Sequence, residues 1–201
     1  MILLRILRRL GGLPDFLRQG VMVVIRANES SFAAAMRGRA YRTSCLIDTD
    51  VVIKNWKGFQ AGEGCALYHG TYILNQQGCV VLGNRSHLGA FCFVNASEGT
   101  VTIGDDVAIG PGTKIFSHSN HYATGKKVTE IHVTRDVQIG NNVFIGANCS
   151  ILPGTRIADN VIIGAGSVVK GWLEPNSVYA GAPGKKIGSG WFEAAAKSVT
   201  R

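Results

Sequence analysis

Two histidines, His118 and His121, lie three residues apart in a polar segment that interrupts an otherwise regular apolar sequence. An imidazole changes its protonation state near neutral pH, so it can accept the proton of a hydroxyl group as that oxygen attacks a carbonyl carbon. A histidine in a solvated loop is commonplace, and neither residue stands out by itself. Residues 116–138 hold three of the five histidines in the chain, so the placement of this segment decides what they can do.

The elements that must position the histidines are set by a six-residue repeat. Twelve aliphatic positions follow the repeat, and eight of them are followed directly by Gly or Ala. They are Leu82, Leu88, Val94, Ile103, Ile109, Ile115, Ile139, Ile145, Ile151, Ile157, Ile163 and Val169. A second position, four residues later, carries nothing large or charged, as at Ser86, Cys92, Val107, Thr113, Val143, Cys149, Thr155, Val161 and Ser167.

One short strand and one tight corner in each hexad explain both restrictions. The aliphatic residue points inward, glycine permits the turn, and the small residue packs beneath it. Three hexads make one triangular coil of about eighteen residues, and stacked coils place Ile103 over Ile139 and Ile157. The repeat therefore predicts an all-β solenoid, a parallel β-helix.

Two breaks interrupt the register. Val94 and Ile103 are nine residues apart, which indicates a three-residue corner insertion within Asn95–Gly99. Between Ile115 and Ile139 the repeat would place His121 and Lys127 in the core, where an unpaired lysine is too costly. We therefore expect residues 116–138 to leave the prism as an extruded loop at one corner and to return at the next.

The predicted organisation is an N-terminal helical segment over 1–49, the β-helix over 50–187 and a C-terminal helix over 188–201. Residues 1–19 fit a basic amphipathic helix, too short and too often interrupted by Arg to cross a bilayer. Such a helix packs on its own oligomer or makes a peripheral contact with an anionic membrane face, and both remain open. A second helix is expected between residues 21 and 36. Pro175 and Pro183 are expected to end the ladder of strands.

Composition narrows the partners and the compartment. The net charge of +8 favours a polyanionic ligand or an acidic surface. Nucleic acid is not expected, because no basic stripe interleaved with aromatics occurs. Five cysteines without a C-x-x-C pair indicate reduced thiols and a cytoplasmic protein, at most at the inner face of the membrane.

The motifs IGDDVAIGPG, VQIGNNVFIGANCSILPGTRIADNVIIGAGSVV and VYAGAPGKKI together carry a specific resemblance over about residues 80–187. They resemble the hexapeptide-repeat acetyltransferases, in the branch of galactoside, maltose and polysaccharide O-acetyltransferases. This resemblance implies a left-handed coil and a homotrimer that holds acetyl-CoA between neighbouring solenoids, with no metal required. It further implies direct acetyl transfer to a sugar hydroxyl, which we expect on a surface polysaccharide or its lipid-linked precursor.

In similar enzymes a histidine of the extruded loop is the general base. Aligned without gaps, that histidine falls on Asn120, and a one-residue shift brings it to His121, so we favour His121 over His118. The resemblance also gives Ala147 as a main-chain donor to the oxyanion. Cys149 occupies a small inward position and is expected to be structural.

The remaining site residues are assigned by matching position. Small residues leave room for the pantetheine arm, Phe144 stands where many relatives carry Trp, and the terminal lysines suit phosphate. The expected acetyl-CoA contacts are Phe144, Ala147, Ala165, Lys170, Pro183, Lys185 and Lys186. For the acceptor, the corner insertion offers Asn95 and Glu98. O- and N-acetylation are not distinguished.

Two other classes of protein share such a solenoid. A γ-class carbonic anhydrase would bind zinc between subunits, and His87, His118 and His121 could be offered as its ligands. A non-catalytic scaffold would use the solenoid as a binding surface and would give the loop histidine no role.

Overall fold

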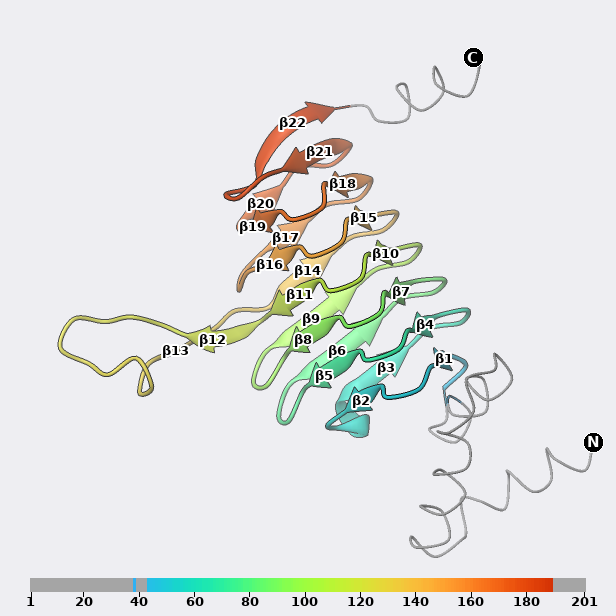
Figure 1. Cartoon of the computed structure of the whole chain (residues 1–201), viewed down its shortest axis with the longest axis horizontal. Helices are drawn as coiled ribbons and strands as arrows, with labels where there is room; N and C mark the ends of the chain where they lie inside the picture. The colour runs from blue at the N-terminus through green and yellow to red at the C-terminus, as the bar shows by residue number, and fades with distance from the viewer. Residues whose placement is uncertain (1–37, 39–42, 190–201) are drawn as a thin grey trace, which may run out of the picture.

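In the computed structural model, which describes residue 38 and residues 43–189, short strands wind into a three-sided solenoid of parallel sheets (Figure 1). The first sheet contains β1 (Leu46–Ile47), β4 (Ala66–Leu67), β7 (His87–Leu88), β10 (Ala108–Ile109), β15 (Phe144–Ile145), β18 (Val161–Ile163), β21 (Ser177–Ala180) and β22 (Lys185–Ser189). The second contains β2 (Val52–Ile53), β5 (Tyr72–Leu74), β8 (Phe93–Asn95), β11 (Lys114–Phe116), β16 (Ser150–Ile151) and β19 (Val168–Val169). The third contains β3 (Phe59–Ala61), β6 (Cys79–Leu82), β9 (Thr100–Ile103), β14 (Val137–Ile139), β17 (Arg156–Ile157) and β20 (Trp172–Leu173), and the short 3-10 helix η1 (Trp56–Gly58) precedes β3.

Columns of aliphatic side chains fill the interior. In the third sheet Ile139 pairs with Ile103 on one side and Ile157 on the other, which confirms the predicted column. All three side chains are at most 3% exposed. Burying each such side chain stabilises the fold by about 1.5–3 kcal/mol, so the stacked coils form one continuous core.

The glycines that follow the aliphatic residues serve close packing, whereas the sequence predicted that they permit the turn. The left-handed backbone falls two residues later, as at Asp106 (φ 58°) after Gly104. A Cβ on Gly104 would lie 2.7 Å from the carbonyl oxygen of Gly140 in the next coil. Glycine is required here because adjacent coils approach closely.

The solenoid begins slightly before residue 50, and its first coils differ from the predicted register. β1 lies within the predicted helical segment 1–49 and pairs with β4. Leu67, and not Cys65, continues the column of Leu88. Cys65 takes the small inward position, with its Sγ 2.8 Å from the carbonyl oxygen of Gly83. The helices predicted in residues 1–36 lie outside the described residues.

The ladder continues past the prolines that were expected to end it. β21 pairs in parallel with β18, and β22 turns back antiparallel on β21. Pro175 and Pro183 lie outside these strands, so neither removes a donor from the ladder. β22 also crosses the predicted boundary at residue 188, and the rest of the predicted C-terminal helix, from residue 190 on, lies outside the described residues.

An arm leaves the solenoid where the second sheet passes to the third. β12 (His118–Asn120) and β13 (His132–Thr134) pair antiparallel, with His118 opposite Thr134. Figure 1 shows this hairpin projecting from one side of the stack. At the base of the arm the amide of Arg135 donates to the carbonyl oxygen of Ser117 at 2.8 Å. The chain is back in the core at Val137, which is fully buried.

Candidate active site

His118 stands at the base of the arm, held by two polar side chains. Its side chain is only 14% exposed, and its Nδ1 lies 3.6 Å from Oε2 of Glu98. The same nitrogen lies 2.9 Å from Oγ1 of Thr134 on the opposite strand. The Thr134 hydroxyl also contacts the Glu98 carboxylate, with 3.3 Å between Oγ1 and Oε2.

These contacts select one tautomer of the imidazole. A carboxylate can only accept, so the single hydroxyl proton of Thr134 goes to Glu98. Thr134 must then accept from His118, which places the ring proton on Nδ1. The lone pair of Nε2 is left to accept a proton from a substrate hydroxyl. His118 therefore has the state that a general base requires.

The elements that assemble this group come from distant parts of the chain. Glu98 belongs to the corner insertion between β8 and β9, one coil below the arm. Thr134 comes from the returning strand, as does His132, whose ring stacks on that of His118 with 5.2 Å between centroids. Sequence reasoning missed Thr134 and His132, because only the pairing of β12 with β13 brings them to His118.

His121, the residue that the sequence favoured, has a different environment. Its side chain is exposed, and its backbone N–H donates to the carbonyl oxygen of Ile131 at 2.8 Å. Within the part of the chain that the structure describes, its ring has no hydrogen-bond or ion-pair partner. Nothing among these residues orients the ring.

The two residues proposed for the acceptor serve different purposes. The side chain of Asn95 accepts from the amide of Ser97 at 3.2 Å and from its hydroxyl at 2.7 Å. Asn95 therefore holds the shape of the corner. Glu98 lies against His118 and Thr134, where it can orient the imidazole.

The residues assigned to the pantetheine arm gather at another corner, between the first and second sheets. Phe144 in β15 is 48% exposed, and Ala147 and Ala165 follow the inward residues of β15 and β18. Among the described residues, the amides of Ala147 and Ala165 donate to no acceptor. They are free to donate to a ligand.

A comparison with the corner between the third and first sheets shows why these amides are free. There the equivalent positions carry Asp or Asn, and the side chains cap amides of neighbouring coils. Asp105 accepts from the Asn84 amide at 2.8 Å, and Asp159 accepts from the Asn141 amide at 2.7 Å. Alanine offers no such acceptor.

The histidine corner and the alanine corner are not the same place on one chain. The arm leaves between the second and third sheets, whereas Phe144 lies on the first. In Figure 1 the arm and β15 lie on opposite sides of the stack. One copy of the chain therefore does not bring His118 to Ala147 and Ala165.

The terminal residues assigned to phosphate lie near the end of the stack. Lys170, Pro183 and Lys185 are exposed. Lys186 donates to Oε2 of Glu174 at 2.6 Å, and this hydrogen bond raises the pKa of the lysine. Lys186 is thus already paired within the chain.

Cysteine and metal chemistry find little support in the described residues. Cys149 is fully buried, and burial raises the pKa of its thiol, which disfavours the thiolate that a nucleophile needs. Among the described residues, no group of three or more His, Cys, Asp or Glu side chains is placed to hold a metal ion. His87 lies in β7 on the first sheet, away from the histidines of the arm.

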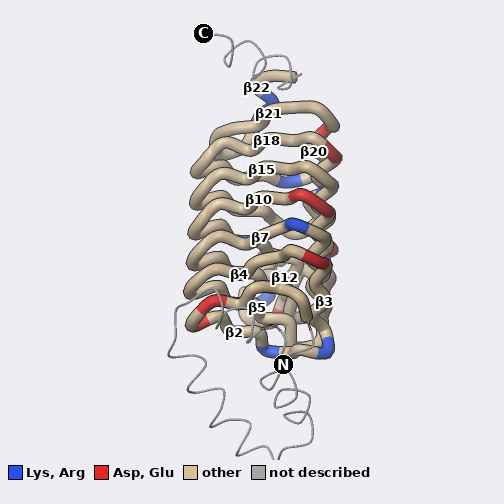
Figure 2. The backbone as a smooth tube through the Cα atoms, turned by 90° about the vertical axis from the view of Figure 1, so that its right-hand side faces the viewer, with Lys and Arg blue, Asp and Glu red and all other residues tan. Residues whose placement is uncertain are grey.

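Charge is distributed unevenly over the solenoid. Figure 2 shows Lys, Arg, Asp and Glu concentrated along one edge, with few on the side formed by β7, β10, β15 and β18. The strands of the first sheet from β1 to β21 contain no charged residue. This sheet presents a mainly apolar outer surface.

A parallel β-helix with an extruded histidine arm defines a hexapeptide-repeat transferase. Residues 136–171 match the family described as bacterial transferase hexapeptide (six repeats). The chain is 31% identical over 158 residues to WbbJ of Escherichia coli K12, whose name assigns it to O-acetyl transfer in lipopolysaccharide biosynthesis, covering 74% of this chain and 78% of WbbJ. The chain therefore belongs to the hexapeptide-repeat acetyltransferase family.

Two further similarities have narrower scope. Galactoside O-acetyltransferase of E. coli K12 is 38% identical over 112 residues, which cover 52% of this chain and 54% of that enzyme. This chain thus matches only about half the length of that relative. The solved structure of AntD, an N-acyltransferase from Bacillus cereus in complex with dTDP and coenzyme A, has a TM-score of 0.66 at 22% identity and covers 78% of this chain and 88% of AntD. It supports the fold alone.

Proposed function

We propose that this protein is an acetyl-CoA-dependent acetyltransferase that moves an acetyl group directly to a sugar hydroxyl. His118 is the general base: its Nε2 accepts the hydroxyl proton while the oxygen attacks the thioester carbon. The tetrahedral oxyanion receives a hydrogen bond from the free amide of Ala147. Collapse of this intermediate expels the CoA thiolate, which takes the proton from the imidazolium. The acetyl group is then on the sugar, and the histidine is neutral again.

The observation that carries this proposal is the contact of His118 with Thr134 and Glu98. It fixes the ring and its tautomer in the family's catalytic loop. The sequence favoured His121, and the lack of described ring contacts there is our reason for preferring His118. Relatives named as galactoside and lipopolysaccharide O-acetyltransferases support a sugar acceptor.

The proposed enzyme is a homotrimer with its sites between copies. The arm and the alanine corner are on opposite sides of one chain, so a complete site requires the arm of one copy and the corner of another. The apolar outer surface of the first sheet is a suitable contact between copies. The left-handed hand of the coil is expected from the family.

Release of free thiol from acetyl-CoA tests the activity. The wild-type protein should release CoA in the presence of one or more acceptors from a panel of galactosides, maltosides, amino sugars and lipid-linked glycans. Acceptor-dependent release defines the substrate class, and analysis of the acetylated product separates O- from N-acetylation. A non-catalytic scaffold would give no acceptor-dependent release.

The zinc alternative is tested separately. Elemental analysis of the purified protein should find no stoichiometric zinc, and chelators should leave thiol release unchanged. Stoichiometric zinc together with hydration of carbon dioxide would favour the γ-class carbonic anhydrase.

Contact of residues 1–19 with an anionic membrane is also proposed, on their basic and apolar composition. In the described residues no helix is long and apolar enough to cross a membrane. Flotation with anionic liposomes should carry the full chain and leave behind the chain that lacks residues 1–19. Equal flotation of the two would favour packing of the segment on the oligomer.

A further inference from the structure

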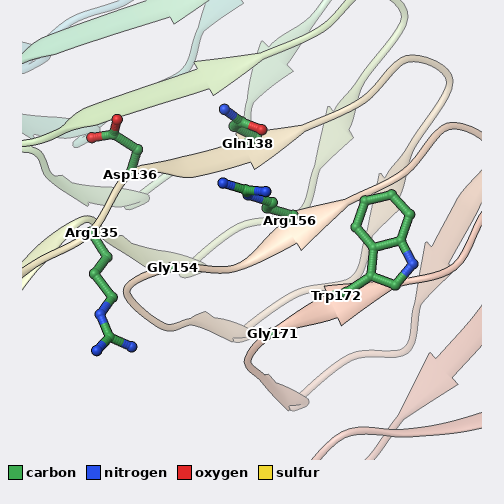
Figure 3. Close-up of a pocket in the computed structure, with 7 residues that line it drawn as sticks. All are labelled: Arg135, Asp136, Gln138, Gly154, Arg156, Gly171 and Trp172. Atoms are coloured by element: carbon green, nitrogen blue, oxygen red, sulfur yellow. The ribbon is translucent and has the colours of Figure 1, made fainter.

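A pocket of about 500 Å³ lies on the third sheet beside the base of the arm. Its lining includes Arg135, Asp136, Gln138, Arg156 and Trp172. Figure 3 shows Arg156 extending toward the base of the arm, with the Trp172 indole farther along the sheet. Sequence reasoning assigned no role to any of these residues.

The pocket contains two guanidinium groups without a fixed anion. Within the described residues, neither Arg135 nor Arg156 has an ion-pair partner. The one carboxylate of the lining, on Asp136, instead accepts a hydrogen bond from the amide of Thr100 at 2.8 Å. Two cations that share a pocket create a positive potential that an anionic ligand would relieve.

The ladder of the third sheet sets the size of the ligand. Gln138 pairs with Arg156, and Arg156 pairs with Trp172, so the three side chains stand one above another. Strands are spaced by about 4.8 Å, so the row from Gln138 to Trp172 is about 10 Å long. That length suits a phosphate or diphosphate joined to one ring.

The chemical character of the lining fits the same ligand. A guanidinium donates two parallel hydrogen bonds to phosphate oxygens. The Trp172 side chain is 61% exposed, which leaves an indole surface for a sugar or base ring to stack on.

The pocket is continuous with the proposed catalytic group. Arg135 directly follows Thr134, whose hydroxyl contacts His118. The Arg135 side chain packs against Gly154 of the next coil, where an added Cβ would lie 3.2 Å from its Cδ. A ligand held here therefore lies beside the residue that contacts the base.

We propose that this pocket binds the phosphate or diphosphate group of a substrate through Arg135 and Arg156, with the adjoining ring on Trp172. The inference rests on the proposed acetyl transfer and deepens it. The same chemistry could come from the nucleotide end of CoA or from an acceptor activated as a sugar diphosphate. The test must therefore distinguish these two sources.

Direct binding by titration calorimetry makes the test independent of turnover. The probes are CoA, pantetheine, which lacks the phosphates, and dTDP-glucose as a sugar diphosphate. The variants are Arg135→Gln, Arg156→Gln, the double variant and Trp172→Ala. Arg85→Gln is the matched control, because this exposed arginine pairs with Asp106 at another corner. Circular dichroism checks that each variant is folded.

Each arginine substitution should weaken binding of a phosphate-bearing probe about tenfold, and the control should change it less than twofold. Loss confined to CoA, with pantetheine unaffected, identifies the cofactor as the source. Loss confined to dTDP-glucose identifies the acceptor. The proposal is overturned if both probes bind the double variant as they bind the wild type, or if the wild type binds neither. A protein that binds the probes but releases no thiol would contradict the proposed function alone.

Discussion

The imidazole of His118 differs from other histidines of the chain in having a complete set of orienting contacts. Thr134 and Glu98 fix which nitrogen carries the proton, and the stacked ring of His132 limits rotation. Residues that act as general bases depend on such orientation, because the lone pair must point at the hydroxyl that it deprotonates.

Replacing His118 by Ala should lower kcat by about 10²–10⁴ while leaving acetyl-CoA affinity near that of the wild type. His121→Ala is the matched control and should change kcat less than tenfold. Steady-state thiol release and calorimetry measure the two quantities. If His121→Ala has the larger effect, the preference drawn from the sequence is restored.

Glu98 is a positioning residue, since it acts through Thr134 and His118. Glu98→Gln should lower kcat about tenfold with little change in KM, because the hydroxyl of Thr134 loses its charged acceptor. Thr134→Val should have a similar effect, and Thr134→Ser should restore most of the activity. A rise in KM for the acceptor with unchanged kcat would instead support the acceptor-binding role first assigned to Glu98.

At the scale of elements, each coil is stabilised mainly by the coils directly above and below it. Ile145 in β15 is fully buried between Ile109 and Ile163 of the neighbouring coils. Its truncation leaves a cavity that the stacked strands cannot close.

Ile145→Ala should reduce the free energy of unfolding by about 2–5 kcal/mol. Ile187→Ala in β22 is the control: this side chain is 66% exposed, so the expected change is within about 0.5 kcal/mol. Urea denaturation followed by circular dichroism measures both. Equal effects would contradict the placement of the core.

For the whole molecule, the separation of the arm from the alanine corner has a direct consequence. If the site is shared, two different defects on different copies leave some sites intact. His118→Ala removes the base, and Ala165→Trp fills the space for the pantetheine arm. Each variant alone should be inactive.

Refolding the two variants together should restore about a quarter of the wild-type activity in a homotrimer, since an intact arm must meet an intact corner. Light scattering should give three times the mass of one chain. Mixed trimers without activity would mean that both groups come from one copy, and a monomer in solution would exclude the shared site.

The sequence predicted much of the solenoid, because the repeat is a local pattern. Ile103, Ile139 and Ile157 stack as the six-residue step requires, since identical coils leave only one register that buries them all. Less regular coils were predicted less well. Cys65 was assigned to the aliphatic column that Leu67 occupies, because Cys also suits a buried position.

The sequence by itself determined the family, the core columns and the segment that must leave the prism, because a charged Lys127 cannot enter an apolar column. Only the tertiary structure decided which histidine has orienting partners. Glu98 and Thr134 reach His118 across a coil and a hairpin, and no local pattern encodes that pairing. The grouping of Arg135, Arg156 and Trp172 likewise follows from strand register, which places residues of different coils in one row.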